Sequence, residues 1–269
     1  MLKFGCSPET PVLLCRQVRG EVPLMVGTRN VSFPRLLNYT YYTYLSAGLV
    51  LFGSLILNIG PDMGWFSYVP LAGPAYSPGR RYDLWSVVVT ASEISAICGG
   101  IEIITTVFKQ RAPGMSLPRI PLFVWSQLIT GGMIIFAMPS VMLCSTMLSM
   151  DRLANVNTHF FNPAEGGDAI LWQHLFWFFA HPEVYIIFIP ATGFVATILQ
   201  TFCRQRTFGY TPLVLAMVAT AKRSPGHPVA AAARSPVFDF EYAFTAPHLG
   251  MHGFRGTGCH SEELPKPHP

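Results

Sequence analysis

The sequence predicts an all-α fold, a polytopic bundle of transmembrane helices with about four full spans, a truncated fifth span and an irregular C-terminal tail. Two observations lead to this prediction. Hydrophobic residues make up 51% of the 269 residues and charged residues only 12%, whereas about a quarter of a soluble domain is usually charged. The apolar residues also gather in long runs, and a helix needs about 20 such residues to cross a bilayer.

Five apolar segments are expected to form the helices. The first four cover approximately residues 38–59, 83–108, 121–150 and 169–200. The fourth is longer than a bilayer requires, so we expect it to be tilted or kinked at Pro182 and broken near Pro190. The fifth starts at about residue 209 and loses its apolar character after Ala221, which makes it too short to cross.

The connections between the spans carry the turn-forming and basic residues. Residues 60–82 are rich in proline and glycine, and with Trp65 and Tyr68 they are typical of a loop at the level of the lipid headgroups. Lysine and arginine number five before the first span, and then two, three, one and two in the successive loops. Because basic residues favour the inner side, we expect the chain to start inside and the fourth span to enter from outside.

Charge and cysteine content exclude two other classes of protein. The net charge is only +4 and the basic residues are scattered over the loops, which gives nucleic-acid binding little support. The six cysteines form no CxxC pair and no zinc-type spacing, and two of them fall inside predicted spans, so a disulfide framework is not expected. They are Cys6, Cys15, Cys98, Cys144, Cys203 and Cys259.

The most informative segment is residues 172–190, WQHLFWFFAHPEVYIIFIP, in which His181, Pro182, Glu183 and Tyr185 interrupt an apolar run. In a helix, His181 and Tyr185 stand four residues apart on one face, so both can contact the same object. Imidazole is a common ligand of transition metals, and a phenol one turn away can supply a proton or an electron. Glu183 has apolar neighbours, and a carboxyl group that is removed from water is suited to passing protons.

Four longer motifs occur in the chain: PLFVWS at residues 121–126, FNPAEGGD at 161–168, QHLFWFF at 173–179 and HPEVY at 181–185. Together they resemble subunit I of the haem-copper oxidases, most closely the cytochrome c oxidase branch. The resemblance covers residues of about 23–221. We therefore divide the chain into an unmatched segment at 1–22, a partial oxidase transmembrane domain at 23–221, and a non-family tail at 222–269 that we expect to be disordered.

The resemblance implies a terminal oxidase of the aerobic respiratory chain, which reduces dioxygen to water with electrons from cytochrome c and couples this to proton pumping. It implies copper and haem as cofactors, membrane lipid and other oxidase subunits as partners, and the bacterial plasma membrane or the mitochondrial inner membrane as the location. In the family, the residue matching His181 binds copper, and the residue matching Tyr185 is covalently linked to that histidine. The residue matching Glu183 ends a proton path. The usual entrance of that path is an aspartate, whereas this sequence has Asn30, and an amide does not exchange protons near neutral pH.

Other family ligands have no counterpart here. After Ala221 the composition changes to proline, glycine, histidine and charge, where the family continues to an adjacent pair of copper-binding histidines. Neither that pair nor the haem-ligating histidines can be matched, and we interpret residues 222–269 as the result of a frameshift, a truncation or a mis-predicted gene end. The histidines in this tail are interpreted as incidental rather than as a metal site: His227, His248, His252 and His260.

Two alternatives to an oxidase stay open. One is a catalytically inactive membrane fragment that lacks haem ligands and most copper ligands. The other is a proton-conducting transporter that uses Glu93, Glu102 and Glu183. The first two of these are nine residues apart, which places them about 180° apart on a helix and disfavours a single path.

The site residues also have structural interpretations. His181 can be a buried histidine bonded to a carbonyl group, Glu183 a neutral carboxyl group and Tyr185 a packing aromatic, although the surrounding motif favours metal binding by His181. We interpret His174 as structural, and His159 and Asp168 as loop and capping residues near the outer surface.

Overall fold

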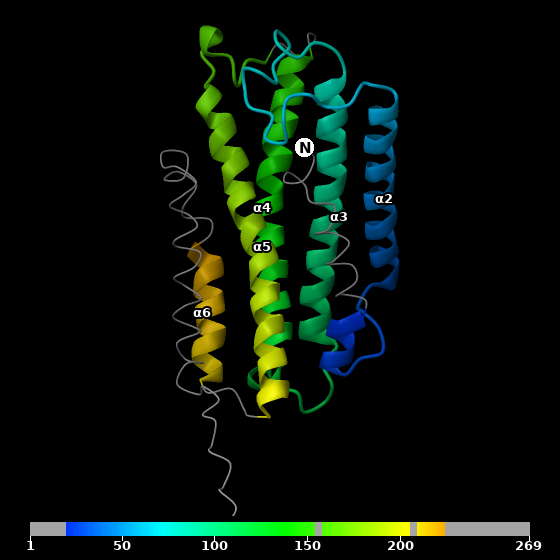
Figure 1. The fold of residues 1–269 in the computed structure, drawn as a ribbon, viewed down its shortest axis with the longest axis vertical. Helices are drawn as coiled ribbons and strands as arrows, with labels where there is room; N and C mark the ends of the chain where they lie inside the picture. The colour runs from blue at the N-terminus through cyan, green and yellow to red at the C-terminus, as the bar shows by residue number, and fades with distance from the viewer. Residues whose placement is uncertain (1–19, 154–157, 205–208, 224–269) are drawn as a thin grey trace, which may run out of the picture.

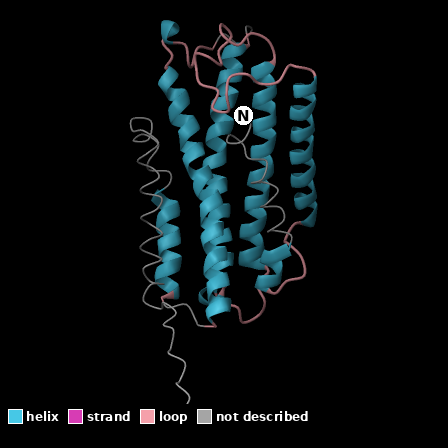
Figure 2. Ribbon diagram, viewed as in Figure 1, coloured by secondary structure: helices cyan, strands magenta, loops and turns pink. Residues whose placement is uncertain are grey.

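Residues 20–153, 158–204 and 209–223 are described by the computed structural model, and they form a bundle of long helices without β-strands (Figures 1 and 2). This confirms the predicted helical membrane bundle. Residues 20–26 are helical and precede α2. The elements that follow are α2 (Pro34–Ile56), α3 (Arg81–Lys109), the 3-10 turn η1 (Leu117–Arg119), α4 (Leu122–Arg152), the 3-10 turn η2 (Pro163–Glu165), α5 (Ala169–Cys203) and α6 (Tyr210–Arg223). The predicted segment 1–22 and tail 222–269 lie almost entirely outside the described residues.

Three of the described helices, α3, α4 and α5, are long and apolar enough to cross a membrane. The predicted first span, α2, is 23 residues long but is not among these three. It carries four tyrosines in its first half, which lower its apolar character: Tyr39, Tyr41, Tyr42 and Tyr44. The predicted fifth span is the 14-residue α6, which is too short to cross, as expected.

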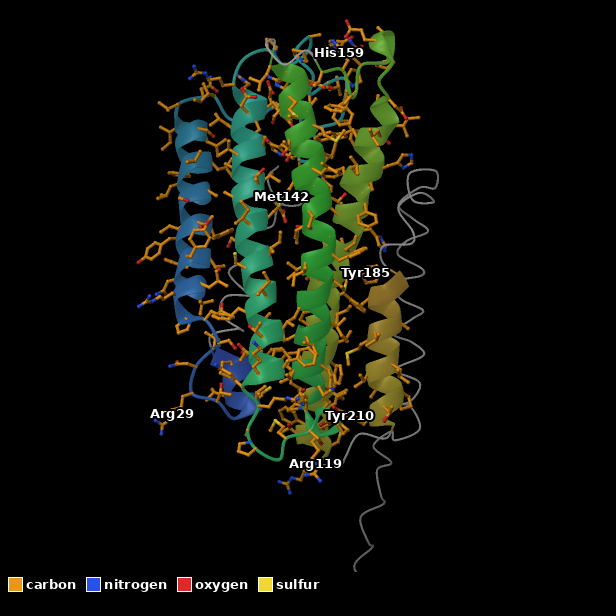
Figure 3. The ribbon with its side chains drawn as sticks, turned by 180° about the vertical axis from the view of Figure 1, so that it is seen from behind. Arg29, Arg119, Met142, His159, Tyr185 and Tyr210 are labelled. Atoms are coloured by element: carbon orange, nitrogen blue, oxygen red, sulfur yellow. The ribbon has the colours of Figure 1, made fainter. Side chains whose placement is uncertain are left out.

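Helix α4 is the centre of the bundle, because it contacts α3, α5 and α6, while α2 packs on α3 (Figure 1). The chain runs alternately up and down, so the connections gather at the two ends of the bundle. Arg29, Arg119 and Tyr210 lie toward one end, His159 lies at the other, and Tyr185 lies between them (Figure 3). The end with Arg29 and Arg119 is the one that basic residues predict to be inside.

The central helices approach each other closely at small residues. A Cβ atom added to Gly100 of α3 would lie 3.1 Å from the carbonyl oxygen of Gly131 in α4, and the reverse distance is also 3.1 Å. At the α4–α5 contact, a Cβ atom on Gly193 would collide with the side chain of Ser126. Small residues at crossing points let helix backbones pack tightly where lipid provides no hydrophobic driving force between helices.

Helix α5 is continuous over 35 residues, so the predicted break near Pro190 is wrong. Pro182 and Pro190 both lie inside the helix and are both buried. Each proline removes one amide donor, but the fixed φ of proline suits a helix. Membrane helices tolerate the lost hydrogen bond when the neighbouring structure packs around it. Burial against the bundle therefore keeps α5 intact where the sequence alone indicated an end.

The outer connection, residues 57–80, is fastened to both α4 and α5. The Arg152 guanidinium donates hydrogen bonds to the carbonyl oxygens of Ala72 (2.8 Å), Ser77 (3.0 Å) and Gly79 (2.8 Å). The Trp172 indole donates to the Phe66 carbonyl oxygen at 3.0 Å. These bonds hold the loop over the outer ends of the helices.

Trp65 and Tyr68, which were predicted to lie at the level of the lipid headgroups, also contact α5. The Trp177 indole donates a 2.8 Å hydrogen bond to the Tyr68 hydroxyl, and the Trp65 ring lies 5.4 Å from that of Phe176. The loop therefore contacts the outer end of α5, on the N-terminal side of the segment that contains the candidate site residues.

Candidate active site on α5

His181 and Tyr185 meet on one face of α5, as their spacing predicts. Their ring centroids are 4.7 Å apart, and the planes are inclined at 67°, which is an edge-to-face contact. Tyr185 is buried, with 8% of its surface exposed, and His181 is half-buried. The phenol and the imidazole thus form one unit in the middle of the bundle (Figure 3).

Glu183 lies between these two residues in sequence and therefore on another side of the helix, about 160–200° away from each. It interacts electrostatically with Glu93 of α3. Glu93 is 4% exposed, and its Oε2 atom has no hydrogen-bond partner within the described part of the chain. Two acidic side chains on different helices thus lie near enough to interact electrostatically, which the sequence did not indicate.

Glu102 lies on the opposite side of α3, which confirms the separation expected from the spacing. It is fully buried and interacts electrostatically with Cys98 one turn away. Ser95 and Thr106 share this side of α3: Ser95 donates to the carbonyl oxygen of Thr40 in α2, and Thr106 accepts from the Ser32 amide. Glu102 therefore belongs to the α2–α3 contact rather than to the α5 site.

Asn30 is exposed near the inner end of the bundle, and its carbonyl oxygen accepts a 2.9 Å hydrogen bond from the Thr28 hydroxyl. It lies before α2, toward the end of the bundle where Arg29 lies, whereas Glu183 lies in the middle part of α5 (Figure 3). The structure therefore brings His181 and Tyr185 together on one side of α5, and it brings neither Glu183 nor Asn30 to them.

The three residues interpreted as structural also have defined places. Asp168 caps α5, because its side chain accepts a 2.8 Å hydrogen bond from the Ile170 amide, which confirms that expectation. His159 lies in the outer loop and forms an ion pair with Glu165. The Nδ1 atom of His174 is buried and has no hydrogen-bond partner within the described residues.

The residues present do not by themselves fit a complete copper site. Within residues 20–153, 158–204 and 209–223, no three histidine, cysteine, aspartate or glutamate side chains are placed to hold one metal ion. His181 stands as a single imidazole, and one ligand defines neither the affinity nor the geometry of a bound metal.

Two relationships could not be read from the sequence. Glu93 and Glu183 interact although they are 90 positions apart and lie on different helices. The sequence indicated only that each apolar run contains a carboxyl group. Nothing in the sequence indicated that Arg152 anchors the outer loop, because an arginine at a helix end is ordinarily interpreted as a surface residue.

Comparison with known proteins gives consistent matches. Residues 21–225 match the family model described as cytochrome C and quinol oxidase polypeptide I. The chain is 40% identical over 201 residues to a probable cytochrome c oxidase subunit 1-alpha of Streptomyces avermitilis, covering 74% of this chain and 34% of that protein. It is 41% identical to cytochrome c oxidase subunit 1 of Cereibacter sphaeroides (74% and 35% covered) and 38% identical to that of Bacillus subtilis (77% and 32%). The chain thus spans about a third of the length of these relatives.

Proposed function

Because the chain belongs to the cytochrome c and quinol oxidase polypeptide I family, we propose that it is a segment of subunit I of a respiratory haem-copper oxidase. The proposed reaction of the whole protein is the reduction of dioxygen to water with electrons from cytochrome c, coupled to proton pumping. The proposed partners are the remaining oxidase subunits and membrane lipid. The proposed location is the bacterial plasma membrane or the mitochondrial inner membrane.

The observation that supports this proposal best is the contact between His181 and Tyr185 on a membrane-spanning helix, with ring centroids 4.7 Å apart. A metal-binding imidazole and a phenol in contact can act on one bound substrate, and the phenol can supply a proton to it. In the complete protein, we propose that His181 contributes one copper ligand. Haem and the other copper ligands would come from parts of the family fold outside the described residues.

Glu183 has a separate role in the proposal. It lies at the depth of the site but on another side of α5, so it can exchange protons without contacting the His181–Tyr185 face. Protons consumed at a buried redox site must cross hydrocarbon on fixed polar groups or water, and a carboxyl group in mid-bundle is such a group. Asn30 does not titrate, so the proton route of this chain is not the one that starts from an aspartate at that position.

A second candidate function is a membrane segment without oxidase activity of its own. It is favoured by the number of ligands, since His181 is the one copper ligand that the family motif assigns within the described residues. A single imidazole does not hold copper tightly, and electron delivery needs haem.

The experiment that separates these candidates uses the detergent-purified full chain. We would record a reduced-minus-oxidised optical spectrum, determine copper and iron, and measure oxygen uptake with reduced cytochrome c, in parallel for His181→Asn. Haem bands, near-stoichiometric copper and an oxygen uptake that H181N abolishes are the results expected of an oxidase. A metal-free, spectrally silent and inactive chain would establish the inactive segment.

The transporter interpretation finds less support. It requires Glu93, Glu102 and Glu183 to line one path, but Glu93 and Glu102 lie on opposite sides of α3. Proton flux into vesicles that contain the chain, measured for Glu102→Gln, tests it: a flux that depends on Glu102 would revive this interpretation.

A further inference from the structure

Glu102 is a fully buried acidic residue that the proposed oxidase reaction does not use. Its exposed fraction is 0%. Helix α3 ends at Lys109 toward the inner end of the bundle, so Glu102 lies seven residues, or about 10 Å, from that end of the helix. An ionisable side chain inside a membrane bundle is costly, and such side chains usually have a functional reason.

Two printed contacts of α3 show which neighbours share the side of Glu102. The hydroxyl of Ser95 donates a 2.9 Å hydrogen bond to the carbonyl oxygen of Thr40 in α2. The hydroxyl of Thr106 accepts a 3.1 Å hydrogen bond from the amide of Ser32, just before α2. Glu102 is seven residues after Ser95 and four before Thr106, which places it within about 40° of both around the helix. It therefore lies on the side of α3 that contacts α2 and the segment before it.

Hydroxyl groups lie between Glu102 and the inner end of the bundle. The side-chain oxygen of Ser32 is buried and has no hydrogen-bond partner among the described residues, and the exposed Asn30 lies two residues earlier. The Thr106 hydroxyl, bonded to the Ser32 amide, is fully buried and lies one turn of α3 from Glu102. A hydroxyl group both donates and accepts hydrogen bonds, so it can pass a proton directly or through water. Ser32, Thr106 and Glu102 thus form an inner polar line.

Other ionisable groups on this side of α3 lie at the inner end or on the helices themselves. Glu21 belongs to the helical residues 20–26, and Arg35 lies in the first turn of α2. Cys98 lies one turn before Glu102 and interacts with it electrostatically. Helix α2 contains no acidic residue, and its remaining titratable side chains are the four tyrosines named above. Glu102 is therefore the carboxyl group that the described helices place within the α2–α3 contact.

We propose that Glu102 takes up a proton from the inner side of the membrane, past the hydroxyl groups of Ser32 and Thr106, and holds it between α2 and α3. An amide at position 30 cannot take up a proton at the surface, whereas a carboxyl group deeper on the inner polar line can. The proposal concerns the uptake step, and it rests on the proposed function only for the use of the proton.

Infrared spectroscopy of the detergent-purified full chain tests this uptake without requiring oxidase activity. Protonated carboxyl groups absorb in a separate carbonyl region, and their bands shift when D₂O replaces water. Glu102→Gln identifies the band of Glu102, and Glu93→Gln, on the opposite side of α3, should leave that band in place. Thr106→Val removes the hydroxyl group nearest to Glu102. Thr105→Val is its matched control, because the Thr105 hydroxyl donates to the Ile101 carbonyl oxygen of its own helix.

We expect E102Q to remove a carbonyl band at acidic or neutral pH, and we expect that band to shift in D₂O in the unmodified chain. T106V should slow the shift about tenfold, the rate equivalent of one lost hydrogen bond, whereas T105V should not. The proposal is overturned if E102Q removes no carbonyl band, if the band does not exchange, or if T106V and T105V exchange equally fast. Ser32→Ala serves as a second variant if T106V fails to fold, and it should also slow the exchange.

Oxygen uptake in membranes that contain the assembled oxidase separates failure of this inference from failure of the proposed function. E102Q should lower the uptake about 10²-fold. Adding Asn30→Asp to E102Q should restore most of it, because this supplies a carboxyl group at the exposed start of the inner polar line. Exchange that depends on Thr106, with an uptake insensitive to E102Q, would retain the proton site and reject its use by the oxidase. A Glu102 that does not exchange, with an uptake that Tyr185→Phe abolishes, would reject the proton site and retain the proposed function.

Discussion

Gly100 of α3 and Gly131 of α4 meet backbone to backbone, and a Cβ atom on either would lie 3.1 Å from the carbonyl oxygen of the other. Gly132 is the next residue of α4, and a Cβ atom there meets nothing within 4 Å. The two neighbouring glycines thus differ in their surroundings while sharing one helix. They provide a matched pair of sites for testing how the central helices pack.

We predict that Gly131→Ala destabilises the bundle and that Gly132→Ala does not. Alanine favours a helix over glycine by about 1 kcal/mol at both sites. At Gly131 the added methyl group must also push α3 and α4 apart, and overpacking of this kind costs about 1–3 kcal/mol. Thermal unfolding in detergent should show a lower midpoint for G131A and an equal or higher midpoint for G132A. Equal shifts for the two variants would show that the helices do not cross at this glycine.

Arg152 is predicted to be the main anchor of residues 57–80. Its side chain is 6% exposed, it donates to three loop carbonyl oxygens, and its guanidinium lies 5.0 Å from the Tyr82 ring centroid. Arg152→Ala should cost about 1–3 kcal/mol, because it leaves three loop carbonyl oxygens without their charged donor. It should also expose the loop to proteolysis.

Arg81→Ala is the control for Arg152. Arg81 pairs with Asp62 at 3.0 Å, but both side chains are partly exposed, and exposed ion pairs contribute about 0–1 kcal/mol. Limited proteolysis of residues 57–80 should therefore separate the two variants clearly. If R81A loosens the loop as much as R152A does, the anchoring role assigned to Arg152 is wrong.

Asp151 is predicted to order the outer loop before α5. Its two carboxylate oxygens accept hydrogen bonds from the amides of Phe160 (3.0 Å) and Phe161 (2.9 Å). Asp151→Asn keeps one acceptor oxygen but replaces the other with an NH₂ group, which cannot accept from a backbone amide. We therefore expect the free energy of unfolding to fall by about 1–3 kcal/mol. Hydrogen exchange at the amides of Phe160 and Phe161 should become faster.

The same substitution at Asp168 provides the comparison. Asp168 caps α5, and asparagine caps a helix about as well as aspartate, so Asp168→Asn should change stability by less than about 0.5 kcal/mol. If the amides of Phe160 and Phe161 remain protected from hydrogen exchange in D151N, Asp151 does not order the outer loop.

Tyr185→Phe tests the chemistry proposed for the α5 site. The phenyl ring keeps the edge-to-face contact with His181, but the variant has no hydroxyl proton to give. In membranes that contain the assembled oxidase, oxygen uptake should fall about 10²-fold or more, the usual loss when a positioned proton donor is removed. The unfolding midpoint should change only by the equivalent of about 1 kcal/mol.

Tyr68→Phe is the matched control for this variant. Tyr68 accepts a 2.8 Å hydrogen bond from the Trp177 indole in the outer loop, away from the His181–Tyr185 contact. It should retain oxygen uptake despite losing one hydroxyl group. Full activity in Y185F would remove the phenol from the proposed mechanism.

Patterns within single helices were predicted well from the sequence. The fixed rise and twist of a helix bring His181 against Tyr185 and separate Glu93 from Glu102, without any information from tertiary structure. The cap at Asp168 was predicted for the same reason, because a short side-chain oxygen before an apolar run bonds the first free amides. These features depend only on residues a few positions apart.

Features that depend on packing were not predicted. Pro190 lies inside α5 because burial against the bundle outweighs the lost amide hydrogen bond, and local propensity indicates only the cost. Glu93 lies near enough to Glu183 to interact electrostatically because both α3 and α5 border α4, and spacing along one helix says nothing about depth on another.

Helix α3 carries one buried carboxyl group on each of two opposite sides, Glu93 on one and Glu102 on the other. A helix backbone uses its amides and carbonyl groups in its own hydrogen bonds and so has none left to relay a proton across its width. The backbone of α3 therefore separates the two carboxyl groups, and substitution of either one alters one helix contact while the opposite contact stays in place.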